Sequence, residues 1–286
     1  MTLLRVAALG DSLTEGLGDP RADGTWRGWA PLLADSLAPV AEAVDLRNLA
    51  TSGARTADVL HRQLPRARAH RPQLASVLVG VNDTLRASYD IAAVARSLDR
   101  TLGALADDGV LLLTACLPDP GRMLGLPAPL ARPLARRMRS VNEVVHVLSE
   151  RYPSVHVHVA ACDWVRDPRM WSVDRLHPSE RGHRALAGEF HALLAARGTA
   201  LGPAPDPEPT GVAPTRTAQT RWMATKGTSW VLERCTDLLP DLFRLAVAEA
   251  RRRNSDLLDR EAALNTEEVL RELALVPGPD TLRAVS

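Results

Sequence analysis

The chain has 286 residues, and its 35 basic and 34 acidic side chains leave a formal net charge of +1. A charge so close to zero gives no global field that would attract nucleic acid or an anionic membrane. Hydrophobic residues make up 45% of the sequence, which excludes wholesale disorder, whereas aromatic residues make up only 3%. The core is therefore expected to consist mainly of Ala, Leu and Val.

Lysine and cysteine usage narrows the possible chemistry. The single lysine is Lys226, so neither a phosphate-binding P-loop nor a catalytic lysine has a candidate before the C-terminal region. The cysteines, Cys116, Cys162 and Cys235, lie far apart and form no C-x-x-C pair. That spacing disfavours a zinc ribbon and a disulfide framework, and it fits a reducing compartment.

The N-terminal residues are apolar, but they are too few and too weakly basic for a secretion signal. No window of the sequence approaches the roughly 18 apolar residues of a membrane-spanning helix. We therefore expect a cytoplasmic protein without an integral membrane segment.

Short apolar runs alternate with longer helical patterns over the first two hundred residues. The predicted strands are 3–9, 44–49, 74–80, 110–115 and 155–159, and the predicted helices are 29–38, 56–69, 90–107, 130–151 and 180–196. Runs such as Leu74-Ala-Ser-Val-Leu-Val lack strict alternation, as expected for strands covered on both faces. A repeated strand–helix–strand order predicts an α/β fold with a parallel sheet and right-handed crossovers.

The composition of the sequence changes near residue 200. Five prolines follow in a short stretch, which predicts a semi-extended linker over 200–217 between a domain at 1–199 and a helical C-terminal extension at 218–286. Within the extension, 229–250 has a helical pattern interrupted at Pro240, and Thr266 is the predicted N-cap of a further short helix. The extension is too small for its own core, so its apolar residues are expected to pack on the domain or on a partner.

Reactive side chains follow the predicted strands at their carboxyl ends, where parallel sheets gather functional groups. Ser12 follows the first strand, Gly53 the second and Asn82 the third, while Asp174 and His177 precede the last helix of the domain. All five are therefore expected on one rim of the sheet.

This set of residues suits nucleophilic catalysis. A serine hydroxyl needs a base, a histidine titrates near the working pH, and a carboxylate fixes the tautomer of that histidine. The N–H groups of Ser12 and Gly53, with the amide of Asn82, are candidate donors to an oxyanion. Each element alone also has a simpler interpretation as a turn, a helix cap or a metal pair, and only their joint occurrence favours catalysis.

Four sequence blocks carry a family resemblance: ALGDSLTEG at 8–16, NLATSG at 48–53, GVND at 80–83 and DRLHP at 174–178. Over roughly residues 3–197 the chain resembles the SGNH or GDSL hydrolases. The resemblance implies a flavodoxin-like three-layer α/β/α sandwich with a five-stranded parallel sheet, and hydrolysis of small-molecule carboxylic esters or thioesters without a metal or other cofactor. It also implies that Ser12 is the nucleophile, that His177 is the base oriented by Asp174, and that Ser12, Gly53 and Asn82 form the oxyanion hole.

Three rival functions remain open at this point. An acyltransferase would use the same residues, and a non-catalytic ligand- or partner-binding module would keep the fold. A metal-dependent phosphoesterase would instead use Asp11, Asp174 and histidines. The acyl chain, the alcohol portion of the substrate and the oligomeric state are not determined by the sequence.

Several other residues have two interpretations each. His156 and His158 alternate with valines and so share one face of a strand, where a polar sheet face or packing under a helix is favoured over a metal site, which would need a third ligand. Four of the six tryptophans, Trp26, Trp29, Trp164 and Trp171, either wall an acyl pocket or fill the core. Asp11 and Asp83 are expected to hold loop geometry, and His183 is expected to be structural.

Overall fold

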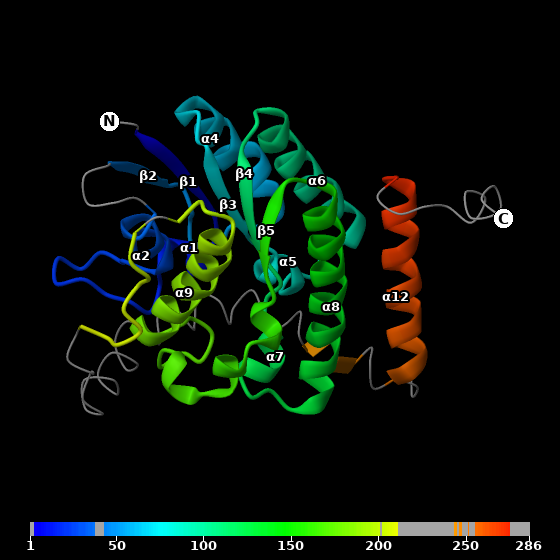
Figure 1. The fold of residues 1–286 in the computed structure, drawn as a ribbon. Helices are drawn as coiled ribbons and strands as arrows, with labels where there is room; N and C mark the ends of the chain where they lie inside the picture. The colour runs from blue at the N-terminus through cyan, green and yellow to red at the C-terminus, as the bar shows by residue number, and fades with distance from the viewer. Residues whose placement is uncertain are drawn as a thin grey trace.

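The computed structural model describes residues 3–37, 43–200, 202–210, 243–244, 246–247, 251 and 255–274. Its described residues form one sheet of five parallel strands in the order β2-β1-β3-β4-β5. The strands are β1 (Leu4–Gly10), β2 (Val44–Asn48), β3 (Leu74–Leu78), β4 (Leu111–Ala115) and β5 (Ser154–Val157) (Figure 1). The predicted parallel α/β sheet is therefore confirmed, with strand ends shifted by one or two residues.

Helices cover both faces of this sheet, which makes a three-layer sandwich (Figure 1). One layer consists of α2 (Trp29–Asp35) and α9 (Glu180–Ala196), which pack against each other and on the strands β2 and β5. The other layer consists of α4 (Leu64–His70), α6 (Ile91–Asp107) and α8 (Ala128–Arg151). Shorter helices at the carboxyl ends of the strands are α1 (Ser12–Glu15), α5 (Val81–Thr84) and α7 (Pro120–Met123).

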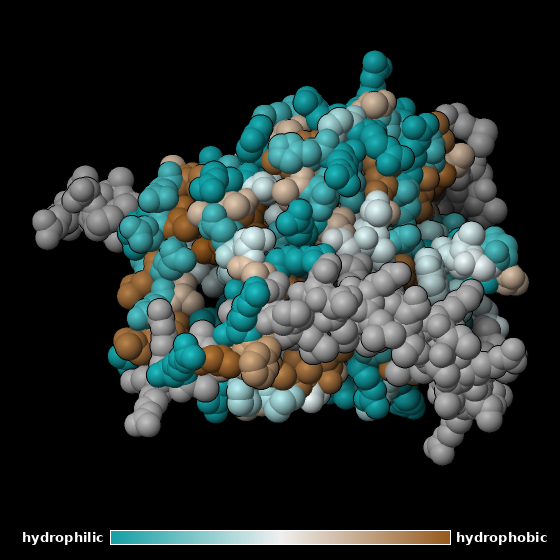
Figure 2. Space-filling view, turned by 180° about the vertical axis from the view of Figure 1, so that it is seen from behind, coloured by the Kyte–Doolittle hydropathy of each residue, from teal (hydrophilic) through white to brown (hydrophobic). Residues whose placement is uncertain are grey.

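The helices are amphipathic, and this determines which face each one buries. In α6 the buried residues are Ile91, Val94, Ala95, Leu98, Thr101, Leu102 and Leu105, the spacing of one helical stripe. Asp90 caps this helix by accepting a hydrogen bond from the N–H of Ala92 at 2.9 Å. All five residues of β3 are buried, as expected for a central strand between two helical layers. Figure 2 shows hydrophilic residues over the upper part of the face opposite to that of Figure 1, with hydrophobic residues gathered along its lower and left parts.

The single helix predicted over 56–69 is wrong in detail. The segment is divided into α3 (Thr56–Asp58), the π-helical turn η1 (Val59–Gln63) and α4. Pro65 lacks an N–H and its ring collides with the carbonyl of the preceding turn, so a regular helix cannot continue through it. The wider π-turn absorbs this interruption, and such turns occur frequently at functional sites.

The prediction that Thr266 begins a short helix is also wrong. Thr266 lies inside α12 (Ser255–Glu272), which packs along α8 and α6 (Figure 1). Its buried hydroxyl bonds Ala262 O and Ser140 Oγ, both at 2.8 Å, so the residue serves an interior contact and not a cap. The helical pattern predicted over 229–250, including Pro240, lies almost entirely outside the described residues.

The segment after α9 lies against the start of that helix. The Arg184 guanidinium donates to Asp206 O at 2.9 Å, and Arg181 forms an ion pair with Glu208 at 2.8 Å. The domain boundaries at 199 and 217 stay predictions. No helix within the described ranges is long and apolar enough to cross a membrane.

Candidate active site

Ser12 is the first residue of α1, directly after β1. Gly10 ends that strand with a φ of 151°, and a Cβ there would lie 2.3 Å from Leu78 O on the neighbouring strand, so only glycine fits. Asp11 caps the helix by accepting a hydrogen bond from the N–H of Leu13 at 3.1 Å. The tight strand-to-helix turn therefore holds Ser12 at the carboxyl edge of the sheet, with 9% of its surface exposed.

Gln63, which is not among the predicted site residues, fixes this turn. Its side-chain amide accepts from Gly10 N at 2.8 Å and donates to Gly10 O at 2.9 Å. Gln63 is buried on the π-turn η1, so both backbone groups of Gly10 are satisfied inside the protein. The only sequence signal is that this glutamine falls on the apolar face of the helix predicted over 56–69.

The loop before α9 brings Asp174 and His177 to the same place. Arg175 between them adopts a left-handed φ of 59°, which is uncommon for a residue with a side chain and turns the loop back sharply. Asp174 Oδ1 accepts hydrogen bonds from the backbone N–H of Leu176 and of His177, both at 2.9 Å, and from Ser172 Oγ at 2.7 Å. Three hydrogen bonds therefore hold Oδ1 of the carboxylate, which leaves Oδ2 to contact the imidazole of His177.

A continuous hydrogen-bonded chain joins the three residues. His177 Nδ1 donates to Asp174 Oδ2 at 2.6 Å, and Ser12 Oγ donates to His177 Nε2 at 2.7 Å. Burial alone would raise the pKa of Asp174. The hydrogen bonds from His177 and Ser172 and the charge of His177 outweigh this effect and lower the pKa of Asp174 to about 2. An ionised Asp174 selects the tautomer in which Nε2 carries the lone pair that faces the Ser12 hydroxyl.

A backbone contact holds the histidine loop against the serine segment. Gly18 has a φ of 100°, and a Cβ on it would lie 1.9 Å from Pro178 O, next to His177. Close by, the buried His183 ring contacts Leu17 O through Nε2 at 2.9 Å, and burial lowers the pKa of His183 to about 4. His183 is therefore neutral and joins α9 to the loop that follows Ser12.

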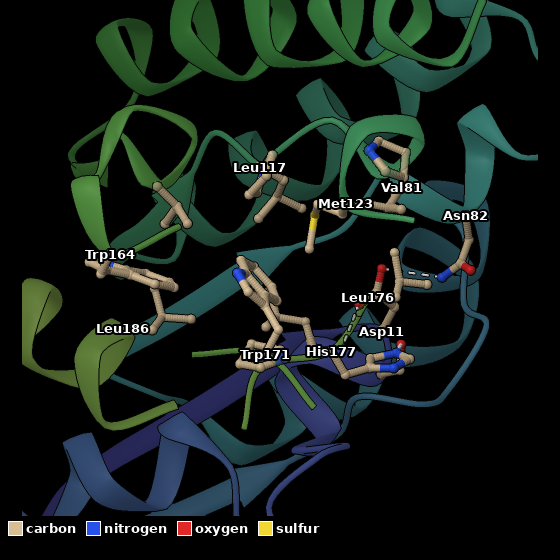
Figure 3. A pocket seen from close by; sticks show the side chains of 16 residues that line it. Asp11, Val81, Asn82, Leu117, Met123, Trp164, Trp171, Leu176, His177 and Leu186 are labelled. Carbon is tan, nitrogen blue, oxygen red and sulfur yellow. Dashed lines mark hydrogen bonds between the residues drawn. The ribbon is translucent and has the colours of Figure 1, made fainter. Parts of the chain in front are cut away.

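The predicted oxyanion residues Asn82 and Gly53 lie at the same rim of the sheet, where the Asn82 amide hydrogen-bonds other protein groups. The amide of Asn82 donates to Asp11 Oδ2 at 3.2 Å and to Ala54 O at 3.1 Å, as the dashed line in Figure 3 marks for Asp11. Gly53 follows β2 with a φ of 80°, and its neighbour Ser52 donates its N–H to Glu15 Oε2 at 2.6 Å. Asn82 lines the cavity beside Ser12, whereas Gly53 is not among the residues that line it.

Asp83, next to Asn82, links two of the helices at this rim. Its carboxylate accepts from Thr56 Oγ1 at 2.8 Å and from Thr56 N at 3.1 Å, which ties α5 to α3. Burial is the main influence on this group and raises the pKa of Asp83. These contacts are those expected of a residue that holds loop geometry.

A cavity of about 60 Å³ opens beside Ser12 and His177. Its walls are mainly apolar, and the side chains of Leu117, Met123 and Trp171 point into it (Figure 3). Trp164 and Trp171 both line the cavity, with ring centroids 6.0 Å apart. By contrast, Trp29 is buried in the core, stacked on Phe190 at 5.1 Å, and Trp26 pairs with Pro20 in an isolated bridge.

Comparison with known proteins agrees with this geometry. The model of the GDSL-like lipase/acylhydrolase family matches residues 8–185, which span Ser12, Gly53, Asn82, Asp174 and His177. The chain belongs to the GDSL-like lipase/acylhydrolase family. No curated protein matches it.

Solved structures confirm the fold of this GDSL-like hydrolase. A variant of an acetyl xylan esterase from Geobacillus stearothermophilus is 21% identical, with a TM-score of 0.55 over 70% of this chain and 97% of that one. A lipase/acylhydrolase from Enterococcus faecalis is 19% identical, with a TM-score of 0.54 over 71% and 99%. A psychrotrophic esterase from Pseudoalteromonas sp., inhibited by monoethylphosphonate, is 16% identical, with a TM-score of 0.53 over 68% and 97%.

Proposed function

We propose that this GDSL-like hydrolase is a serine esterase that cleaves small carboxylic esters through an acyl-enzyme. The observation that carries the proposal is the chain of short hydrogen bonds from Asp174 through His177 to Ser12, which ends beside an apolar cavity. Such a chain gives a serine hydroxyl a base and gives that base an orienting carboxylate.

In the proposed first step, Ser12 Oγ attacks the ester carbonyl carbon while its proton moves to His177 Nε2. The carbonyl oxygen becomes an oxyanion, and the imidazolium is stabilised by Asp174. The C–O bond to the alcohol then breaks, and the alcohol departs with the proton from His177, leaving the acyl group on Ser12. A water attacks this acyl-enzyme by the same sequence, which releases the acid and restores the Ser12 hydroxyl.

The oxyanion donors in this proposal are the N–H groups of Ser12 and Gly53 and the amide of Asn82. Because the Asn82 amide donates to Asp11 and Ala54, it has to exchange one of these partners for the oxyanion. Hydrogen bonds of this kind commonly tighten only when substrate is bound.

Neighbouring structures support the proposed roles. The acetyl xylan esterase from Geobacillus stearothermophilus has also been solved as catalytic mutants in which a serine, an aspartate or a histidine is replaced by alanine. In that enzyme the aspartate and the histidine lie three positions apart, as Asp174 and His177 do here. A metal-dependent route through Asp11 and Asp174 has less support, because within the described residues neither belongs to a group of three metal-type ligands.

The proposed acyl group is short. A cavity of about 60 Å³ is small, which suits acetyl to butyryl groups and not a long fatty chain. Leu117, Met123 and Trp171 would enclose this acyl group, while the alcohol portion stays outside the cavity.

The proposal is tested with the Ser12→Ala variant and a series of p-nitrophenyl esters from acetate to decanoate. We expect Ser12→Ala to lose turnover by about 10⁴-fold or more and to lose labelling by a fluorophosphonate probe. The wild type should prefer the acetate and butyrate esters. Ser97→Ala is the matched control, because the Ser97 hydroxyl bonds its own helix through Ala93 O at 2.8 Å. Unchanged hydrolysis or labelling in Ser12→Ala would contradict the proposal.

A further inference from the structure

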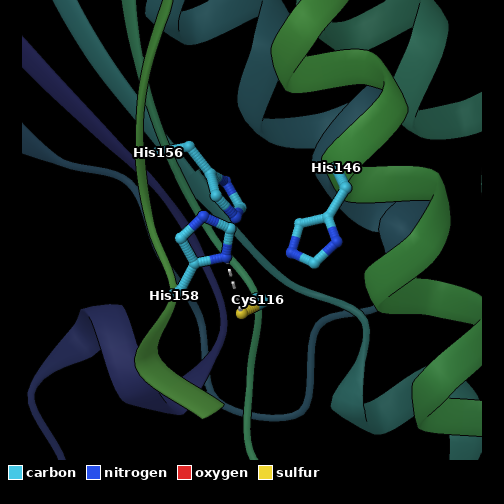
Figure 4. Close-up of side chains that lie close together, drawn as sticks. All are labelled: Cys116, His146, His156 and His158. Atoms are coloured by element: carbon cyan, nitrogen blue, oxygen red, sulfur yellow. Dashed lines mark hydrogen bonds between the residues drawn. The ribbon is translucent and has the colours of Figure 1, made fainter. Parts of the chain in front are cut away.

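Three histidines and a cysteine gather on the α8 side of the sheet, behind the wall of the cavity. His146 comes from α8, His156 and His158 come from the end of β5, and Cys116 follows β4 (Figure 4). One candidate ligand atom from each of the four residues lies within 4.8 Å of the others. We refer to these four residues as the histidine–cysteine cluster.

The fold brings the cluster together through backbone pairing. The strand period of two places His156 and His158 on one face of β5, and Thr114 of β4 is in register with His156. Cys116 continues β4 and donates its N–H to Val157 O at 3.2 Å. On α8, the Asn142 amide bonds both Leu117 N and Leu117 O at 2.9 Å, and one turn later His146 faces the same region.

The ring positions fit one tetrahedral ion. The centroids of His146, His156 and His158 are 4.9, 5.0 and 4.7 Å apart in pairs. Metal–nitrogen bonds of about 2.0 Å at tetrahedral angles place imidazole centroids about 5 Å apart. Cys116 Sγ lies 4.0 Å from His158 Nδ1, whereas zinc–sulfur and zinc–nitrogen bonds put such atoms about 3.5 Å apart. Small side-chain rotations are therefore enough to close the site.

Hydrogen bonds around His156 determine which of its nitrogens faces the cluster. Ser149 Oγ donates its hydrogen to Val145 O at 2.6 Å, so Thr114 Oγ1 is the donor in its 2.7 Å contact with Ser149 Oγ. Both hydroxyl hydrogens are then used, and His156 Nδ1 must donate to these oxygens, at 3.0 and 3.2 Å. The lone pair of His156 is consequently on Nε2, as in metal-binding histidines whose other nitrogen donates to an outer group.

Two buried nitrogens of the cluster lack a partner. Within the described part of the chain, neither His146 Nε2 nor His156 Nε2 has a hydrogen bond. A buried polar atom without a partner is costly, and a metal ion would satisfy both. Neutral imidazole is the form that binds a metal.

We propose that His146, His156, His158 and Cys116 form a four-coordinate site for Zn²⁺ or a similar tetrahedral divalent ion. The three imidazoles bind as neutral rings, and the Cys116 thiol binds as a thiolate after releasing one proton to the solvent. Thiolate and imidazole are the ligands that zinc accepts, and a set of four protein ligands leaves no open position for a hydrolytic water. The site is therefore structural and separate from Ser12.

The expected effect of this ion is to fix one wall of the cavity. Cys116 is followed directly by Leu117 and His158 by Val159, and both of these residues line the cavity. His158 is exposed, so the ion has a path from solvent into the site. One ion would thus clamp α8 to the ends of β4 and β5.

The test uses the full chain after treatment with a chelator, titrated first with Co²⁺ and then with Zn²⁺. We expect one equivalent of Co²⁺ to give the visible bands of a tetrahedral ion and a thiolate-to-cobalt charge-transfer band, and Zn²⁺ to abolish both. Zn²⁺ should also raise the melting temperature of the protein. His158→Ala, at an exposed position with little risk to folding, should weaken binding at least 10-fold, in the range seen for loss of one metal-site group.

Matched controls separate this site from adventitious binding. Cys116→Ser should lose the charge-transfer band, whereas Cys162→Ser, at the other free cysteine of the described residues, should keep it. His61→Ala removes an exposed histidine outside the cluster and should bind metal as the wild type does. Absence of a tetrahedral spectrum, or equal binding by His158→Ala and the wild type, overturns the proposal. Loss of the charge-transfer band in Cys162→Ser and not in Cys116→Ser also overturns it.

Discussion

His177 and His156 are two histidines with opposite surroundings. Both ring nitrogens of His177 have side-chain partners, a carboxylate on one side and the Ser12 hydroxyl on the other. His156 has two hydroxyls on Nδ1, while its buried Nε2 has no hydrogen bond within the described residues and faces two further imidazoles. No carboxylate belongs to the histidine–cysteine cluster.

The difference shows that partners decide what a histidine does. A carboxylate on one nitrogen supports the positive charge that a base acquires, so His177 suits proton transfer. Burial among other imidazoles disfavours that charge, and the unpartnered Nε2 of His156 suits the cation proposed above. The following predictions test this comparison, and the last of them uses a contact remote from both histidines.

The largest effect is expected from Asp174→Asn, which removes the carboxylate partner of His177. We expect kcat to fall by about 10⁴-fold because the imidazole takes the wrong tautomer and loses support for its charge. The measurement is p-nitrophenyl acetate hydrolysis, together with a Co²⁺ titration that should remain unchanged. A loss of less than tenfold would show that Asp174 does not orient the base.

A smaller loss is expected for Asn82→Ala. If its amide stabilises the oxyanion, kcat should fall by about 10²–10³-fold with little change in KM. Steady-state kinetics on p-nitrophenyl acetate separate the two parameters. Activity within twofold of the wild type would mean that Asn82 only bonds Asp11 and Ala54 and takes no part in the transition state.

The contribution of Asp174 to the free energy of unfolding should depend on pH. Its pKa is about 2 in the folded protein against 3.8 ordinarily, so its ionised form stabilises the fold above pH 3.8. This contribution of roughly 2 kcal/mol is lost as the pH falls from about 4 to 2. We therefore expect the difference in free energy of unfolding between the wild type and Asp174→Asn to shrink across that window. Denaturant unfolding at a series of pH values measures it, and a constant difference would contradict the low pKa.

The smallest effect is expected from Thr266→Val on the outer side of α8. Removing the hydroxyl deletes its bond to Ser140 Oγ and should lower the free energy of unfolding by about 1 kcal/mol. Neither fluorophosphonate labelling nor the cobalt spectrum should change, because the contact faces away from both regions. Loss of cobalt binding in this variant would show that α12 is coupled to His146 through α8.

Much of the fold and rim could be predicted because the signals are local. Apolar runs mark each strand, and the residue that follows a parallel strand lies at the carboxyl edge whatever the rest of the chain does. Ser12, Asn82 and the Asp174–His177 pair could therefore be assigned to one rim from the order of residues in the chain.

Long-range relations could not be predicted in this way. The register of α8 against β5 decides whether His146 meets His156, and nothing near either residue specifies it. Likewise, the bond between Gln63 and Gly10 spans 53 positions, and the contact of Thr266 with Ser140 depends on where α12 packs. The partners of the Asn82 amide are set by the path of loops whose conformation has no periodic signal.

The contact between Gly18 and Pro178 lies apart from the apolar residues that line the cavity. The segments that carry Ser12 and His177 meet where the main chain at Gly18 approaches Pro178 O, and the apolar side chains of Leu117, Met123 and Trp164 take no part in that contact. Under the proposed function, exchanging these three residues should admit bulkier acids while the contact between Ser12 and His177 is kept. Position 18 offers no such freedom, so engineering for new esters should begin with Leu117, Met123 and Trp164.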